Sequence, residues 1–279
     1  MSEALNRIKF PELIIGIAGP IGINIDAITE CLEAALKNVG YSQVTVKLTT
    51  EMESVGAPFA KAATQDYYSI IKYKMDRANA ICKFFKSRSA MVSIGIRAIH
   101  NRRREINGKQ SGATKRLDAA LEKTAFIVRQ LKRPDEVEVF RKVYGRQFIL
   151  VSGYGSVHER RKIIAENLRR TLPMNTRADE VAQKAEYLMI RDASEDEDHY
   201  GQHLRDTFHL ADVFVDGIQI QEMSEKLDRF IQALFGKADI APSKQEYGMY
   251  AAKSAALRSS DLSRQVGAAL VSPDGEIIT

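Results

Sequence analysis

Three glycines near the start of the chain have the spacing of a phosphate-binding turn. They stand at Gly16, Gly19 and Gly22 in GIAGPIGINI, between an apolar run and a stretch that reads as a helix. A strand that enters a glycine turn and leaves it as a helix points backbone N–H groups at one place, and the helix N-terminus adds partial positive charge. The residues expected to bind a nucleotide there are Gly16, Gly19, Pro20, Ile21, Gly22, Ile23 and Asn24.

The same turn lacks the groups that phosphoryl transfer needs. Aligned on GPIG, it resembles the P-loop of nucleoside and nucleotide kinases, in which Gly-Lys-Ser/Thr soon follows. Here that region holds Asn24, Ile25 and Asp26, so the lysine and the magnesium-binding hydroxyl are both missing. We therefore expect a degenerate P-loop that can hold nucleotide or phosphate without transferring it. A tight β–α turn that needs glycine only for its geometry is the open alternative.

Histidines and acids give a weaker indication of a metal site. His199 and His203 are four residues apart beside three consecutive acids, so one helical turn could present two imidazoles. No third ligand follows from the pattern, which favours surface histidines, and the acidic residues 191–198 predict a solvated loop. Another glycine-containing stretch, GKQSGAT at residues 108–114, predicts a loop without phosphate binding because no apolar strand precedes it. We assign no catalytic residue and no metal ligand to this chain.

Composition is that of a globular protein with one large domain or two smaller ones. The 279 residues are 44% hydrophobic and 28% charged, with a formal net charge of +5. No basic start precedes an apolar segment, and the longest apolar run is short and broken by glycines, so we expect a cytoplasmic protein without a membrane partner. Cys31 and Cys82 give neither a disulfide framework nor a zinc spacing and are expected to be core thiols.

Positive charge is concentrated in residues 72–104, which hold ten Lys or Arg residues and one acid, Asp76. Such a segment could bind nucleic acid or nucleotide phosphates, with Tyr73, Phe84 and Phe85 available for stacking. It could equally be a solvated helix face or a contact with another subunit of a homo-oligomer. An apolar stripe at helical spacing, which ends in Phe85, uses that ring for packing and favours the second interpretation.

The order of the expected elements predicts an α/β fold with a parallel sheet and flanking helices. Strands are expected before the glycine turn and at residues 44–48, 124–131, 147–155 and 213–215. Helices are expected after the glycine turn as far as Gly40, within an insertion at about 64–106, at 133–145, 156–172 and 178–192, and before Gly236. Strands that alternate with helices are typical of a sheet covered on both faces.

A second module is expected to begin after the linker KADIAPS. Ser243 and Glu246 have the spacing of a capping box that opens a helix. VGAALV, the turn SPDG and EIIT then predict a two-stranded antiparallel hairpin. The predicted domains are therefore residues 1–236, with the helical insertion, and residues 243–279. Because EIIT reads as a strand that continues, we expect the chain to be part of a longer protein.

The second module resembles a known family. AAKSAALRSSDLSRQVGAALVSPDGEIIT looks like the opening helix and first hairpin of the zinc-dependent cytidine and deoxycytidylate deaminases. RDASEDEDHYGQHLRDTFHLADVFVD and LKRPDEVEVFRKVYGRQF are similar to the amino-terminal half of one branch, the bacterial anti-phage deoxycytidine-nucleotide deaminases. In that branch a P-loop kinase-like domain precedes the deaminase domain, which has an α/β/α fold. The resemblance spans nearly the whole chain.

The resemblance implies an antiviral enzyme that depletes cytosine deoxynucleotides. The complete protein would deaminate dCMP or dCTP with zinc held by a His-x-Glu and a Pro-Cys-x-x-Cys motif. Neither motif is present in these residues, so the chain is expected to be the amino-terminal part, without zinc or deaminase activity. Residues 263–268 would shape the floor of the substrate pocket.

Two other functions remain open. One is a nucleotide or nucleoside kinase-like protein, against which the missing lysine counts. The other is a non-enzymatic module that senses a regulatory nucleotide or an RNA through the basic segment.

Overall fold

The computed structural model describes residues 10–56, 66–110, 116–261 and 264–278. They belong to two compact units, Met1–Ile231 and Gln232–Thr279. The division falls inside the helix that the sequence analysis expected to close the first domain before Gly236. Among the described residues, none of the helices combines the length and the apolar character needed to span a bilayer.

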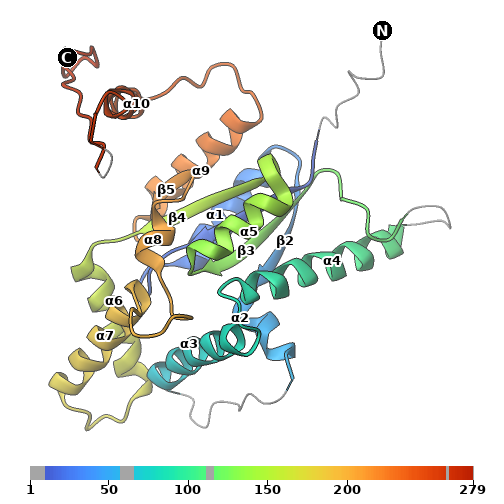
Figure 1. Cartoon of the computed structure of the whole chain (residues 1–279), viewed down its shortest axis with the longest axis vertical. Coiled ribbons are helices and arrows are strands. Elements are labelled where there is room, and N and C mark those ends of the chain that lie inside the picture. The colour runs from blue at the N-terminus through green and yellow to red at the C-terminus, as the bar shows by residue number, and fades with distance from the viewer. Residues whose placement is uncertain (1–9, 57–65, 111–115, 262–263, 279) are drawn as a thin grey trace. The chain divides into compact units, whose positions relative to one another are not determined.

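The described part of the first unit contains a sheet of five parallel strands in the order β2-β3-β1-β4-β5, with helices around it (Figure 1). The strands are β1 (Leu13–Ala18), β2 (Ser42–Lys47), β3 (Thr124–Leu131), β4 (Phe148–Tyr154) and β5 (Val213–Asp216). Every residue of the central strand β1 is buried, as expected where helices cover both faces of a sheet. The predicted α/β fold with a parallel sheet is confirmed.

Helices cover the two faces of this sheet. Those of the first unit, the last of which crosses its boundary, are α1 (Ile25–Asn38), α2 (Leu48–Glu51), α3 (Tyr67–Phe84), α4 (Ala90–Gln110), α5 (Pro134–Tyr144), α6 (Val157–Thr171), α7 (Ala178–Ala193), α8 (Leu204–Phe208) and α9 (Ile220–Leu234). Phe140 of α5 packs with Phe126 and Leu150 on one face. On the other face, Ile28 of α1 lies so close to Gly153 that a Cβ there would approach its Cδ1 to 2.7 Å.

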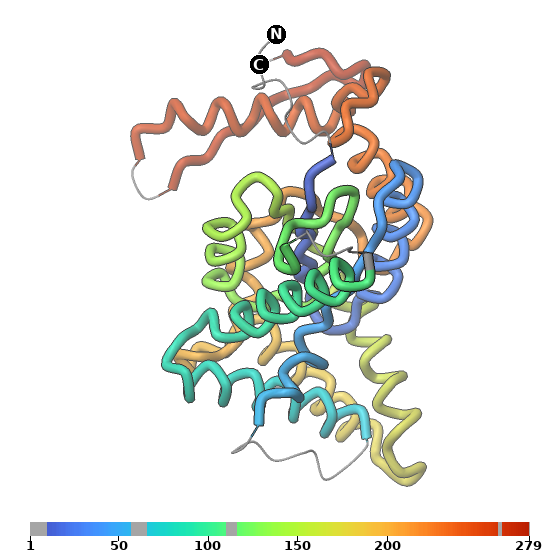
Figure 2. The backbone as a smooth tube through the Cα atoms, turned by 90° about the vertical axis from the view of Figure 1, so that its right-hand side faces the viewer, coloured from blue at the N-terminus to red at the C-terminus, as the bar shows by residue number. Residues whose placement is uncertain are grey.

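The basic segment forms α3 and α4, seen as helical coils in the teal to green part of the tube in Figure 2, and neither belongs to the sheet. α3 packs on α6 and α7, where Met75 contributes to a separate apolar cluster. α4 instead contributes Val92 and Ile99 to the main core. The prediction of helices is therefore confirmed, but α4 is also a covering layer of the sheet.

Three details differ from the sequence-based expectation. Phe85 does not pack in the core, because α3 ends at Phe84 and the two rings lie edge to face with 60% and 55% of their residues' surfaces exposed. Gly108 is helical rather than part of a loop, since α4 continues through Gln110, while residues 111–115 lie outside the described part. β2 ends at Lys47, and Leu48 already begins α2.

The second unit contains the predicted capped helix, α10 (Lys244–Ala256). The Ser243 amide donates to Glu246 Oε2 at 2.7 Å, and the Glu246 amide donates to Ser243 Oγ at 3.2 Å. The predicted hairpin is reduced, in the described residues, to one antiparallel bridge between Val271 and Ile277. A two-stranded ribbon has only one neighbour for each strand and is marginal by itself, which explains the short pairing. Residue 263 lies outside the described part.

Candidate functional site

The glycine turn joins β1 to α1, and its glycines are required by close packing within the chain. Gly22 has φ +92°, and a Cβ at this position would lie 2.8 Å from the Arg160 carbonyl oxygen. A Cβ on Gly19 would lie 2.5 Å from Ile23 Cδ1. Gly16 lies within β1, where a Cβ would meet Leu131 Cδ1 at 2.7 Å. At all three positions, therefore, close packing leaves no room for a Cβ, and at Gly22 the positive φ also favours glycine.

A cavity of about 250 Å³ opens beside this turn. It is lined by six of the seven predicted residues, which are Gly19, Pro20, Ile21, Gly22, Ile23 and Asn24. Gly16, further back in the strand, does not line it. Further walls come from the carboxyl ends of β2 and β3, from α3, from the end of α7 and from single residues of neighbouring helices, among them Met91 of α4 and Glu136 of α5. Ligands of open parallel sheets bind at the carboxyl ends of the strands, so the cavity lies where a ligand is expected.

Some of the backbone amides of the turn already have partners within the protein. The Ile21 amide donates to Asp192 Oδ2 at 2.7 Å, and the Asn24 amide donates to the Gly217 carbonyl at 2.9 Å. Asn24 also caps α1, because its Oδ1 accepts from the Ala27 amide at 2.9 Å. A carboxylate of the chain itself thus bonds to an amide that the sequence analysis expected to face phosphate.

The buried Asp192 and the partly buried Lys132 form an ion pair against the turn. Lys132 Nζ lies 2.7 Å from Asp192 Oδ1 and donates to the Gly19 carbonyl oxygen at 2.7 Å. Lys132 follows β3, 113 residues after Gly19, so local sequence patterns gave no signal for it. The expectation of a solvated acidic loop is wrong for Asp192, which is buried in the last turn of α7.

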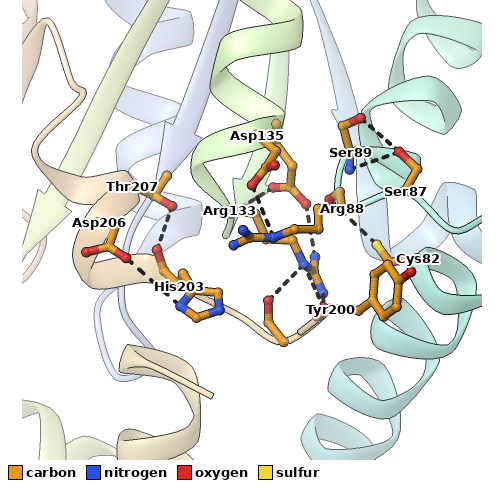
Figure 3. Close-up of polar contacts among 12 residues, drawn as sticks. Cys82, Ser87, Arg88, Ser89, Arg133, Asp135, Tyr200, His203, Asp206 and Thr207 are labelled. Carbon is orange, nitrogen blue, oxygen red and sulfur yellow. Dashed lines mark hydrogen bonds and ion pairs between the residues drawn. The ribbon is translucent and has the colours of Figure 1, made fainter. Parts of the chain in front are cut away.

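A second ion pair, between Arg133 and Glu136, is fully buried and lines the same cavity; Figure 3 shows Arg133 beside Tyr200. Arg133 Nη1 lies 3.0 Å from Glu136 Oε1, and Arg133 Nη2 donates to Asn79 Oδ1 at 2.7 Å. Arg133 Nε also donates to the carbonyl oxygens of Tyr200 and Gly201, at 3.0 Å each. Burial opposes the charge of Arg133, but Glu136, Cys82 and Glu195 together outweigh it, so the pKa of the guanidinium is raised. This network joins α3, α5 and the segment after α7.

His203, one of the two histidines that the spacing singled out, occupies the N-cap position of a helix in the structure. His203 precedes α8, and its carbonyl oxygen accepts from Thr207 Oγ1 at 2.8 Å (Figure 3). Its Nδ1 lies 3.9 Å from Asp196 and 4.0 Å from Asp206. Within the described ranges, no group of three or more His, Cys, Asp or Glu side chains is arranged to hold a metal ion.

Five basic side chains line the cavity, and three of them are paired with carboxylates. Arg129 pairs with Asp26 at 2.7 Å, and the two ion pairs described above account for Lys132 and Arg133. Lys47, at the end of β2, and Lys74, in α3, make no hydrogen bond or ion pair with any residue that the structure describes. The described lining therefore has two positive charges in excess.

Comparison with known proteins finds similar solved structures but no matching family. No family model matches the chain, and no curated protein matches it. Similar solved structures include a gluconokinase from Sinorhizobium meliloti 1021, with 13% identity, 82% of this chain and 98% of that chain covered, and a TM-score of 0.35. An uncharacterized protein from Eubacterium ventriosum ATCC 27560 has 10% identity, 79% and 98% coverage and a TM-score of 0.39. A shikimate kinase from Bacteroides thetaiotaomicron has 11% identity, 80% and 97% coverage and a TM-score of 0.36.

Proposed function

We propose that the first unit is a nucleotide-binding regulatory domain. The observation that supports this proposal best is the cavity beside the glycine turn, whose lining holds two lysines without a hydrogen-bond or ion-pair partner among the described residues. Phosphate groups are the common biological anions that such a site attracts. Apolar residues of α3, including Ile71 and Met75, also line the cavity and offer a surface for a base or sugar.

We further propose that the complete protein is a zinc-dependent deoxycytidine-nucleotide deaminase of antiviral defence, in which this chain is the amino-terminal portion. The support is the sequence resemblance, above all in residues 243–279. The capped helix α10 agrees with the opening helix that this resemblance implies. Zinc and the catalytic glutamate would come from the His-x-Glu and Pro-Cys-x-x-Cys motifs of the complete protein, with dCMP or dCTP as the substrate.

Phosphoryl transfer by the glycine turn is the weaker candidate. The turn has no lysine of its own, and Lys132, which lies against it, is held by Asp192 and the Gly19 carbonyl oxygen. The Asp192 carboxylate already compensates the positive charge of Lys132, so this lysine does not require a phosphate as its partner. We therefore expect nucleotide binding without ATP turnover.

The test has a binding arm and a catalytic arm. The 279-residue chain should bind dCMP or dCTP in calorimetry, and should neither hydrolyse ATP nor phosphorylate a deoxynucleoside. A chain extended through the downstream reading frame should hold stoichiometric zinc and release uracil nucleotide, whereas the 279-residue chain should do neither. Phosphoryl transfer above that of a Gly22→Asp control would support the kinase alternative, and deamination by the 279-residue chain would contradict the proposed location of the chemistry.

An RNA-sensing surface is a second candidate, favoured by the exposed rings of Phe84 and Phe85 beside Lys83 and Lys86. Stacking of bases on such rings contributes about 1–3 kcal/mol per base. The double variant Phe84→Ala/Phe85→Ala should then weaken binding of a labelled single-stranded RNA at least about tenfold. Unchanged RNA binding would exclude these rings from RNA recognition. A lower oligomeric mass of the variant would instead identify them as a contact of the proposed homo-oligomer.

A further inference from the structure

We propose that Lys47, Lys74 and Arg129 bind the phosphoryl group of a nucleoside monophosphate, beside β2 and α3 rather than on the backbone amides of the glycine turn. This inference rests on the proposed nucleotide binding and specifies where the phosphate lies. The three residues come from β2, α3 and β3 and line one cavity. Nothing in the spacing of the glycines indicates them.

The first argument is the balance of charge in the described lining. Asp26, Glu136 and Asp192 are the carboxylates of the cavity, and each lies in an ion pair with a different basic residue. Lys47 and Lys74 remain without a described partner. An anion that enters the cavity therefore meets uncompensated positive charge near these two lysines.

The second argument is the burial of Arg129. The residue is 9% exposed, and its Nε is a buried donor without a partner in the described part of the chain. Its Nη2 is held by Asp26, whose side chain is 73% exposed and can be solvated when the ion pair opens. A guanidinium presents a planar set of donors that matches phosphate oxygens. The Nε–H is thus an unsatisfied donor that is enclosed by protein, and a ligand oxygen would become its acceptor if the Asp26 ion pair opens and the guanidinium turns toward the cavity.

The third argument is the electrostatic state of Lys74. Burial lowers the pKa of its ammonium group, the positive charge of Lys47 lowers it further, and Glu53 only partly opposes the two effects. Holding two lysines of like charge at a half-buried site costs free energy in the absence of an anion. Bound phosphate would remove this cost, which is the pattern of a ligand site rather than of a structural contact.

The fourth argument is the occupation of the turn. The Asp192 carboxylate accepts the Ile21 amide at 2.7 Å, and Asp192 is buried. A phosphate placed on the same amide would meet a carboxylate at close range, and like charges repel strongly in a buried environment. Among the described residues, no carboxylate is bound to Lys47 or Lys74, and the carboxylate that holds Arg129, that of Asp26, is 73% exposed, so the phosphate is better accommodated beside these residues.

The walls of the cavity indicate what else the ligand carries. Ile71, Met75 and Ala78 of α3 and Met91 of α4 are apolar lining residues, and Tyr67 adds an aromatic ring. A volume of about 250 Å³ is small for a ligand site. A single phosphate joined to one sugar and one base fits this combination of charge and apolar surface better than a long polyphosphate.

The experiment compares two lysines of the same helix. Lys74→Met should weaken binding of dCMP to the 279-residue chain by about 10- to 100-fold, because a charge-assisted contact is lost. Lys72→Met should leave binding unchanged, since Lys72 pairs with Asp76 on the exposed side of α3. Ligand-free Lys74→Met should melt no lower than the parent chain, because the substitution removes a half-buried positive charge beside Lys47. Loss of binding then cannot be attributed to unfolding.

The outcomes separate this inference from the proposed function. If dCMP binds the parent chain and Lys74→Met equally well, while Gly22→Asp abolishes binding, the phosphate lies on the turn and the inference is wrong. If no deoxycytidine nucleotide binds the parent chain, the proposed function fails as well. Deoxycytidine that binds as tightly as dCMP would show that the phosphoryl group contributes nothing, which also overturns the inference.

Discussion

Replacing Glu136 by leucine is expected to lower the free energy of unfolding by about 3–5 kcal/mol. The substitution removes the carboxylate that faces the buried guanidinium of Arg133. It also removes the acceptor for the Lys132 and Arg133 amides at the start of α5, at 2.7 and 3.2 Å. The guanidinium would keep its charge without its ionic partner, which is the costly part of the change. Urea denaturation followed by circular dichroism measures the effect.

The control is a double variant, Glu136→Leu/Arg133→Met. Because both charges are then absent, we expect it to be more stable than Glu136→Leu alone, although it loses the contacts of Arg133 with Asn79 and Tyr200. If the loss of stability in the double variant equals the sum of the losses in Glu136→Leu and Arg133→Met alone, Arg133 and Glu136 do not interact energetically. A single variant as stable as the parent chain would contradict the assignment of this pair to the support of the cavity.

Replacing Arg103 by methionine is expected to cost about 3 kcal/mol or more, although it lies in a run of three arginines that reads as a nucleic-acid contact. Arg103 is buried, and its Nε lies 3.0 Å from both carboxylate oxygens of Glu12. Glu12 also accepts the Leu121 amide at 2.8 Å. Without the guanidinium, the Glu12 carboxylate would remain buried with one backbone donor.

The matched control is Arg104→Met, the next residue of α4. Arg104 is exposed, so its substitution should change the free energy of unfolding by no more than about 0.5 kcal/mol. Thermal or urea denaturation of the two variants gives the comparison directly. Equal stability of both variants would show that the ion pair of Arg103 is not a structural anchor of α4.

The three inner strands, β1, β3 and β4, were predictable from sequence because each is a short apolar run next to a turn residue. β3 begins and ends at the predicted residues, Thr124 and Leu131, since both faces of an inner strand must be apolar. The start of α10 was predictable because its capping box joins Ser243 and Glu246, which are only three residues apart in the sequence. The end of α3 was not, because periodicity alone places Phe85 on the apolar face, whereas the helix stops one residue earlier.

The electrostatics of the site could be predicted only in part. The glycine turn was visible as a spacing, but the contact between Ile21 and Asp192 joins residues 171 positions apart. Neither Lys132 nor Asp192 belongs to a pattern that marks it as a neighbour of the turn. No sequence pattern distinguishes Lys47 and Lys74 from other lysines of the chain. They become candidates for the proposed phosphate site only because β2 and α3 bring them into one cavity.

The bond between Asp192 and the glycine turn has a consequence for protein engineering. An attempt to install kinase activity by giving the turn a lysine and a hydroxyl, at Asn24 and Ile25, would leave the carboxylate on the Ile21 amide. The new lysine would then find an acidic partner inside the protein before any nucleotide arrived, and Asn24 would no longer cap α1. Neutralising Asp192 and giving Lys132 another anionic partner are therefore prerequisites for such a design, and the change would have to begin in α7 rather than in the turn.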